Sequence, residues 1–89
     1  MKAEIFNYSG FIKETDPHKL KDKFSELLYL SEFDVLGFQE HFFTPIGYTA
    51  LWLLGESHFA IHTFPEQGKT YIELSSCNEA KKVFFVANI

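Results

Sequence analysis

Residues 55–66 read Gly-Glu-Ser-His-Phe-Ala-Ile-His-Thr-Phe-Pro-Glu, and this stretch decides how the rest of the 89-residue chain is interpreted. From Ser57 to Phe64 it is rich in aromatic and β-branched residues and is ended by a proline, a pattern that predicts a strand. On a strand, His58 and His62 share one face about 13 Å apart, at roughly 3.3 Å per residue, so a single metal ion does not bind both. The same pair would suit zinc only on a helix, so no metal site is expected.

The nearby Ser57 and the cysteine Cys77 are candidates for nucleophilic catalysis. Serine hydrolases place their nucleophile in Gly-x-Ser-x-Gly at a strand-to-helix turn, and residues 55–59 lack both the second glycine and the helix. Cys77 is the only cysteine, which excludes an intramolecular disulfide and a multi-thiolate zinc site. No thiol-protease signature surrounds Cys77, so spacing alone favours a buried core residue. For each histidine, a structural hydrogen-bonding role is an equal alternative.

Runs of aromatic and β-branched residues between turn residues predict six strands. These strands are Ile5–Ile12, Val35–Phe43, Tyr48–Leu54, Ser57–Phe64, Thr70–Ser76 and Val83–Ala87. The mostly apolar run Tyr48–Leu54 is short enough to predict a strand buried on both faces. With one helix between the first two strands, the order of elements predicts one α+β domain over residues 1–89 with a mainly antiparallel sheet.

One helix is predicted between the first two strands. It begins at Asp16 and Pro17, because the aspartate can cap free backbone amides and proline suits the first helical position. Its apolar stripe is formed by Leu20, Phe24, Leu27 and Leu28. One helix of about four turns covers only one face of a sheet this wide, so the other face needs a partner. The 11 phenylalanines have more ring surface than a small monomer easily buries. This excess also indicates a partner that covers the other face of the sheet.

The charge and hydropathy of the sequence argue against a nucleic-acid-binding, membrane or exported protein. Eight basic and twelve acidic residues give a net charge of −4, and no basic run is present to neutralise a nucleic-acid backbone. No apolar run of about 18 residues and no signal peptide marks the chain for a membrane or for export. We therefore expect a cytoplasmic protein that binds neither nucleic acid nor membrane.

A set of residues with fixed spacing runs through the second half of the chain. It consists of Phe43-Thr44-Pro45-Ile46-Gly47-Tyr48-Thr49, Glu56-Ser57-His58, Ile61-His62-Thr63, Pro65-Glu66 with Gly68, and Cys77. This set resembles the prokaryotic S-adenosylmethionine decarboxylases, and the resemblance covers nearly the whole chain. Members of that family are pyruvoyl enzymes of polyamine (spermidine) synthesis that make their own cofactor by cutting themselves.

The resemblance implies a cleavage site between Glu56 and Ser57. Ser57 would attack the carbonyl of Glu56 and convert the amide to an ester. His62 is implied as the base that removes the Ser57 α-proton, which leads to a pyruvoyl cofactor generated from Ser57. The carbonyl of that cofactor withdraws electrons from the substrate as carbon dioxide leaves, and Cys77 is implied as the acid that protonates the substrate carbon.

The resemblance also implies supporting residues and a quaternary structure. Thr49 is expected to assist the cut, at a position where the family usually has serine. Glu66 is expected to hold the ribose hydroxyls of S-adenosylmethionine, and Phe43 to stack on its adenine. The family dimerises with active sites drawing on both subunits, which implies a homodimer of the αββα-sandwich type.

The sequence departs from the family after Cys77. The family continues with a glycine, a second helix and a last strand, whereas here residues 78–82 lead directly into the predicted strand Val83–Ala87. The second helix is therefore expected to be missing. Three functions stay open: a decarboxylase of S-adenosylmethionine, a pyruvoyl decarboxylase of another amino acid such as ornithine or arginine, and a dimeric binding or regulatory homologue that does not cut itself.

Overall fold

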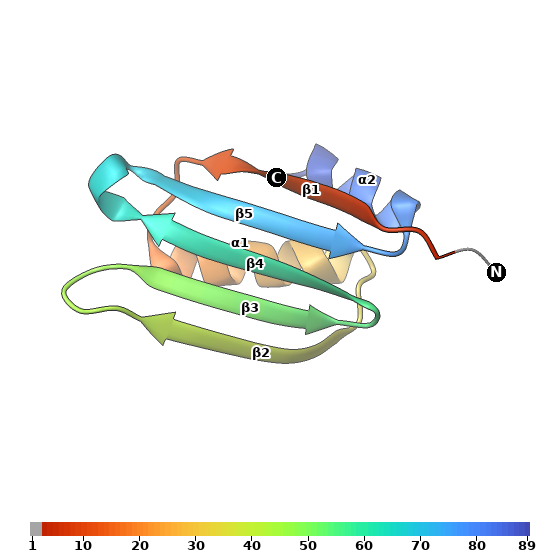
Figure 1. Cartoon of the computed structure of the whole chain (residues 1–89), viewed down its shortest axis with the longest axis horizontal. Helices are drawn as coiled ribbons and strands as arrows, with labels where there is room; N and C mark the ends of the chain where they lie inside the picture. Colours follow the sequence, from red (N-terminus) through yellow and green to blue (C-terminus); the bar gives the residue numbers. More distant parts are fainter. Residues whose placement is uncertain (1–2) are drawn as a thin grey trace.

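The computed structural model describes residues 3–89, which form one five-stranded sheet and two α-helices (Figure 1). In chain order the elements are β1 (Phe6–Ile12), α1 (Pro17–Leu30), β2 (Val35–Phe42), β3 (Tyr48–Leu54), β4 (Ser57–Phe64), the 3₁₀ turn η1 (Pro65–Gln67), β5 (Lys69–Ser76) and α2 (Glu79–Ala87). The predicted α+β class with an antiparallel sheet is confirmed. Within the described residues, neither helix is long and apolar enough to cross a bilayer.

The strands lie in the order β1-β5-β4-β3-β2, and every neighbouring pair is antiparallel. Strand β4 therefore lies at the centre, with β3 on one side and β5 on the other. Its register on β3 places Ser57 opposite Leu54 and His62 opposite Thr49. On β5, the partner of His62 is Tyr71.

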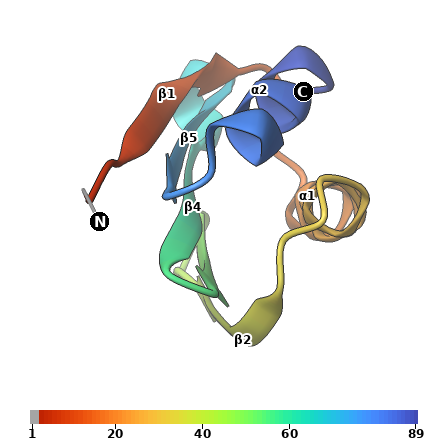
Figure 2. The same ribbon diagram turned by 90° about the vertical axis from the view of Figure 1, so that its right-hand side faces the viewer.

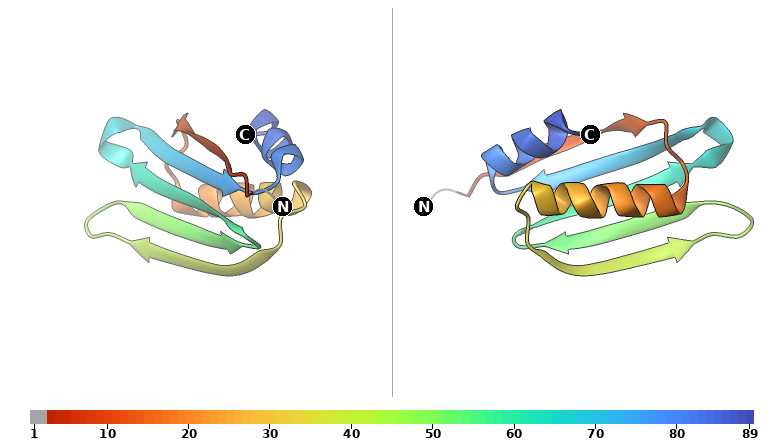
Figure 3. Two further views of the ribbon diagram at one scale, coloured as in Figure 1. Left: turned by 45° about the vertical axis from the view of Figure 1, so that its right-hand side comes forward. Right: turned by 180° about the vertical axis from the view of Figure 1, so that it is seen from behind.

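Both helices cover the same face of the sheet (Figure 2). Helix α1 lies over the central strands, where the Phe24 ring is 4.8 Å from the Phe59 ring of β4 and Trp52 of β3 donates to Ser25 at 3.3 Å. Helix α2 packs beside it against β1 and β5 (Figure 3). Among residues 3–89, no helix covers the opposite face, which we call the uncovered face.

Helix α1 forms as the sequence predicts. The Asp16 carboxylate accepts a hydrogen bond from the Lys19 amide at 2.9 Å, and Pro17 occupies the first turn. The four residues of the predicted stripe are all buried: Leu20, Phe24, Leu27 and Leu28. At the other end, the Ser31 hydroxyl donates to the Leu27 carbonyl at 2.7 Å and satisfies one of the last helical acceptors.

Helix α2 corrects the sequence-based prediction for the end of the chain. The predicted strand Val83–Ala87 is wrong, and so is the expectation that the second helix is missing, because residues 79–87 are helical. The Asn78 side chain caps this helix by accepting from the Lys81 amide at 3.0 Å. Phe85 is fully buried, with its ring 5.1 Å from that of Phe59. This packing of one helical face decides against the strand that the local apolar run favours.

The uncovered face explains a second correction. Strand β3 was predicted to be buried on both faces, but Leu51 and Leu53 are 43% and 54% exposed, whereas their neighbours on the helix side are buried. Large apolar side chains are also exposed in other strands, for example Phe11 of β1 and Phe64 of β4. A partner over this face stays a prediction, and the single chain leaves the apolar side chains in solvent.

Candidate active site

The turn between β3 and β4 consists of Gly55 and Glu56 alone, since Leu54 and Ser57 are already paired. Its positive φ falls on Glu56, at 60°, and not on the glycine. A left-handed conformation costs a non-glycine residue roughly 1–2 kcal/mol. The turn is anchored by the Gly55 amide, which donates to the Asp34 carbonyl at 3.0 Å. The strained residue is thus the one whose carbonyl precedes Ser57.

The Ser57 hydroxyl stays close to this turn. It is half-buried and donates to the Gly55 carbonyl at 3.3 Å. This bond folds the side chain back along the chain toward the Glu56 peptide. The hydroxyl is therefore next to the peptide bond that the resemblance marks for cleavage.

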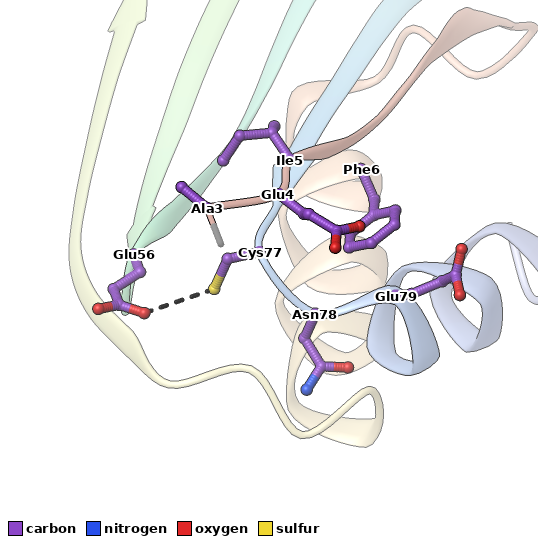
Figure 4. Close-up of a pocket in the computed structure, with 8 residues that line it drawn as sticks. All are labelled: Ala3, Glu4, Ile5, Phe6, Glu56, Cys77, Asn78 and Glu79. Carbon is purple, nitrogen blue, oxygen red and sulfur yellow. Dashed lines mark hydrogen bonds between the residues drawn. The ribbon is translucent and has the colours of Figure 1, made fainter. Parts of the chain in front are cut away.

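Cys77 reaches the same turn from the end of β5 (Figure 4). Its thiol donates to the Glu56 carboxylate, with Sγ 3.5 Å from Oε2. Because Cys77 is exposed, the core role that spacing alone favoured is wrong. The antiparallel pairing of β4 with β5 brings together Glu56, Ser57 and Cys77, which we call the cleavage-end group.

A pocket of about 730 Å³ opens at the cleavage-end group. Its lining comes from the chain leading into β1, the β3–β4 turn and the link from β5 into α2: Ala3, Glu4, Ile5, Phe6, Glu56, Cys77, Asn78 and Glu79 (Figure 4). Three of the lining residues carry carboxylates: Glu4, Glu56 and Glu79. Sequence reasoning missed Glu4 and Glu79, because their positions beside this pocket depend on the β1–β5 register and on helix α2. Only the cap residue Asn78, followed by helix-forming residues, carried a local signal.

The remaining predicted residues lie at the opposite end of the sheet. Thr49 and His62 are cross-strand partners on the uncovered face, with Thr49 Oγ1 3.0 Å from His62 Nδ1. His62 follows Ser57 by five strand residues, which is about 16 Å, and the alternation of side chains directs the two to opposite faces. Within one chain, His62 and Ser57 are therefore not brought together.

Phe43 and Glu66 lie at the same end as His62. Phe43 follows β2, is 51% exposed, and packs edge-on against His41 with ring centroids 4.5 Å apart. It borders a hollow of about 420 Å³ beside the first turn of α1. Glu66 is exposed in η1. We call Phe43, Thr49, His62 and Glu66 the far-end group.

The perturbed titratable groups lie outside both groups. Tyr48 is buried under α1 and donates to Glu40 at 2.7 Å, and burial followed by this bond raises the pKa of Tyr48. The same bond, helped by Lys21 at 3.2 Å, lowers the pKa of Glu40. Among residues 3–89, no three His, Cys, Asp or Glu side chains gather as metal ligands would.

Comparison with known proteins gives consistent relatives. A family model described as S-adenosylmethionine decarboxylase matches residues 5–88. Two similar curated proteins are both named S-adenosylmethionine decarboxylase proenzyme. The one from Pyrococcus furiosus is 30% identical over 64 residues, which are 72% of this chain and 46% of the relative. The one from Brevibacillus brevis is 39% identical over 64 residues, which are 72% of this chain and 48% of the relative. The chain spans about half the length of these relatives.

One solved structure is similar over nearly the whole chain. It is the crystal structure of the adenosylmethionine decarboxylase from Aquifex aeolicus VF5, with a TM-score of 0.81. The match covers 99% of this chain and 78% of that chain, at 19% sequence identity. At this identity the likeness concerns the fold alone.

Proposed function

Because the chain belongs to the S-adenosylmethionine decarboxylase family, we propose that it is a proenzyme that cuts itself between Glu56 and Ser57 and then decarboxylates S-adenosylmethionine. The observation that carries the proposal is the cleavage-end group. It combines a strained Glu56, a hydroxyl on the next residue and a thiol 3.5 Å from the Glu56 carboxylate. A pocket large enough for a small molecule opens beside them.

The proposed cut uses the residues of the turn. The Ser57 oxygen adds to the Glu56 carbonyl carbon, the C–N bond breaks, and the peptide becomes an ester with a free Ser57 amine. Relief of the positive φ at Glu56 favours the cut as a whole, because the severed chain no longer has to close a two-residue turn. Removal of the Ser57 α-proton then expels the main-chain carboxylate of Glu56, which becomes the carboxyl terminus of the first fragment. Water replaces the nitrogen of the resulting dehydroalanine, ammonia leaves, and the amino terminus carries a pyruvoyl group.

The residues present fit a pyruvoyl cofactor because Ser57 supplies its atoms and the pocket lies at that residue. When formed, the group supplies a carbonyl that draws electrons from the substrate as carbon dioxide leaves. The carboxylates of Glu4, Glu56 and Glu79 attract a substrate with positive charge, such as the amine and sulfonium of S-adenosylmethionine. Cys77 lies within the pocket and has the proton that the substrate carbon needs after decarboxylation.

The base for the α-proton would come from a second copy of the chain. His62 lies about 16 Å from Ser57 along β4, so it cannot serve the serine of its own chain. We propose that two copies pack through their uncovered faces as an αββα sandwich, with the far-end group of each beside the cleavage-end group of the other. Thr49 then holds Nδ1 of His62, which leaves Nε2 free for the proton.

Intact-mass measurement tests the cut. Two fragments that divide between Glu56 and Ser57 are expected for the wild-type chain, and one full-length species for Ser57→Ala. A wild-type chain that stays whole on long incubation would instead indicate the binding or regulatory homologue. A missing second helix would have favoured that homologue, but α2 is present.

Mixing two inactive variants tests the shared site. In a dimer of Ser57→Ala with His62→Ala, one site has both Ser57 and His62, donated by different chains. Co-expression should therefore cut the His62→Ala chain, although neither variant cuts alone. If the two residues acted within one chain, the mixture would stay uncut. A tag on the His62→Ala chain identifies which copy is split.

The substrate needs a direct comparison of candidates. Decarboxylation of S-adenosylmethionine, ornithine and arginine should be followed side by side, because all three are cationic. Glu66→Gln should raise KM for S-adenosylmethionine, since Glu66 is proposed to hold ribose hydroxyls that the amino acids lack. Release of carbon dioxide only from ornithine or arginine would assign the chain to the other decarboxylase class.

A further inference from the structure

The uncovered face carries a row of cross-strand partners that includes the proposed base. The pairing of all five strands sets these residues side by side: His41 of β2, Thr49 of β3, His62 of β4, Tyr71 of β5 and Phe11 of β1. His62 lies at the centre of this row. Its neighbours on both sides make contacts with its ring.

Tyr71 packs along one side of the His62 ring. The ring centroids are 6.3 Å apart and the planes differ by only 20°, an offset stack within the range of aromatic pairs. On the other side, Thr49 Oγ1 lies 3.0 Å from Nδ1. The imidazole is therefore held by one polar contact and one planar contact from two different strands.

Tyr71 is itself fixed in place. Its hydroxyl donates to Glu73 Oε1 at 3.0 Å, two residues along the same strand. Phe11 meets the tyrosine ring edge-on at 5.5 Å, and the Lys69 ammonium lies 4.5 Å from the Phe11 ring centre. Because the tyrosine is half-buried and its ring is held in place by Phe11, the ring can limit the motion of the exposed histidine beside it.

The geometry points to Tyr71 as a positioning residue for His62, an inference that rests on the proposed function of His62 as base. The last torsion of a histidine is broad and roughly two-fold, so an unrestrained ring samples orientations in which carbon replaces Nδ1 beside Thr49. The Tyr71 ring restricts that rotation. It keeps Nδ1 on the Thr49 hydroxyl and Nε2 directed away from the strand, where a second copy presents its Ser57.

Three variants separate this role from general packing. Tyr71→Leu removes the ring, Tyr71→Phe keeps the ring and removes the bond to Glu73, and Tyr29→Leu changes an exposed tyrosine of α1 that is 77% accessible. Since misplacement of a catalytic group by about 1 Å can cost 10²-fold in rate, Tyr71→Leu should slow self-cutting by about tenfold or more. Tyr71→Phe and Tyr29→Leu should stay within about twofold of wild type. Rates are compared at a concentration where all variants have the same oligomeric state.

A second measurement does not need self-cutting. In uncut Ser57→Ala protein, the ¹⁵N signals of the His62 ring report which nitrogen carries the proton and whether one orientation dominates. Adding Tyr71→Leu should move these signals toward those of a free imidazole, and adding Tyr71→Phe should not. Unchanged His62 signals in the Tyr71→Leu variant would overturn the positioning role. If the wild type never cuts but the signals shift, the positioning role stands and the proposed function fails.

Discussion

At the scale of single residues, Glu56 stands out because it adopts φ of 60° in a turn that has a glycine next to it. Only one other non-glycine residue among residues 3–89 has positive φ, Glu32 at 66°, just after α1. Both positions store strain that a glycine would release. Glu56 differs because its carbonyl is the proposed point of attack.

Replacing Glu56 with glycine should stabilise the uncut protein and slow the cut. In a Ser57→Ala background, Glu56→Gly should raise the free energy of unfolding by up to about 1 kcal/mol, since the left-handed penalty exceeds the entropy cost of glycine. Glu32→Gly should give a similar gain. With Ser57 restored, only Glu56→Gly should slow the appearance of fragments by mass spectrometry. A Glu56→Gly chain that unfolds more easily than its parent would show that the turn holds no strain.

At the scale of elements, helix α2 depends on one buried ring. Phe85→Ala should lower the free energy of unfolding by about 3–5 kcal/mol, because Phe85 packs among Phe24, Phe33 and Phe59. The preceding residue, Phe84, is 45% exposed. Phe84→Ala should lower the free energy of unfolding by about 1 kcal/mol or less. Denaturant unfolding of the two variants distinguishes them. Equal losses would mean that residues 79–87 do not bury one helical face.

Lys21 of α1 and Glu40 of the edge strand β2 form an ion pair whose effect on stability depends on pH. Glu40 accepts from Tyr48 and pairs with Lys21, and its pKa lies below the ordinary value of 4.5. The folded state therefore favours the charged carboxylate. The charged Glu40 carboxylate stabilises the folded protein above pH 4.5. This stabilisation is lost as the pH falls through the lowered pKa that Glu40 has in the folded state.

Glu40→Gln should accordingly be less stable than wild type at pH 7, and the gap should narrow as the solution is acidified below pH 4.5. Urea unfolding at several pH values measures the gap. Asp22→Asn, which removes an exposed carboxylate of α1, is the control for the loss of one negative charge. A gap that widened in acid would contradict the assigned sign.

Most elements could be predicted from sequence because their signals are local. The capped start of α1, the bounds of β3 and β4, and the alternation of His58 and His62 with Phe59 and Ile61 all follow from neighbouring residues. Helix α2 was missed despite the local cap signal of Asn78, because Val83–Val86 has strand propensity. The burial of Phe85 among residues far from it in the sequence decides for a helix.

The sequence proposed a set of candidate site residues but did not predict how they are arranged. The resemblance named Ser57, His62 and Cys77 without saying that they divide between two ends of the sheet. The five-residue spacing on one strand contained that information, since it corresponds to about 16 Å. The pocket carboxylates Glu4 and Glu79 had no signal of their own, because strand register cannot be read from one sequence.

At the scale of the whole molecule, the uncovered face should control association. Leu53 is 54% exposed there, and Leu53→Glu should convert a dimer into a monomer, because a buried unpaired carboxylate is costly. Leu30→Glu, at a 53% exposed position on α1, should leave the dimer intact. Light scattering after gel filtration reads the mass directly. A Leu53→Glu protein that remains dimeric would place the interface elsewhere.

The strand order has a consequence for the severed molecule. A break after Glu56 would leave β1, β2 and β3 on one piece and β4 and β5 on the other, yet the order β1-β5-β4-β3-β2 inserts the small piece between strands of the large one. Neither piece could then leave without breaking two strand pairings, β1 with β5 and β3 with β4.

The nicked protein would thus be an interlocked two-chain assembly whose melting is also a dissociation. Its Tm should rise with protein concentration, as mass action requires of any folded state that unfolds into separate chains. The uncut Ser57→Ala chain should show a smaller dependence, from dimerisation alone. Calorimetry across a dilution series measures both, and an equal dependence in the two proteins would mean that the pieces unfold without separating.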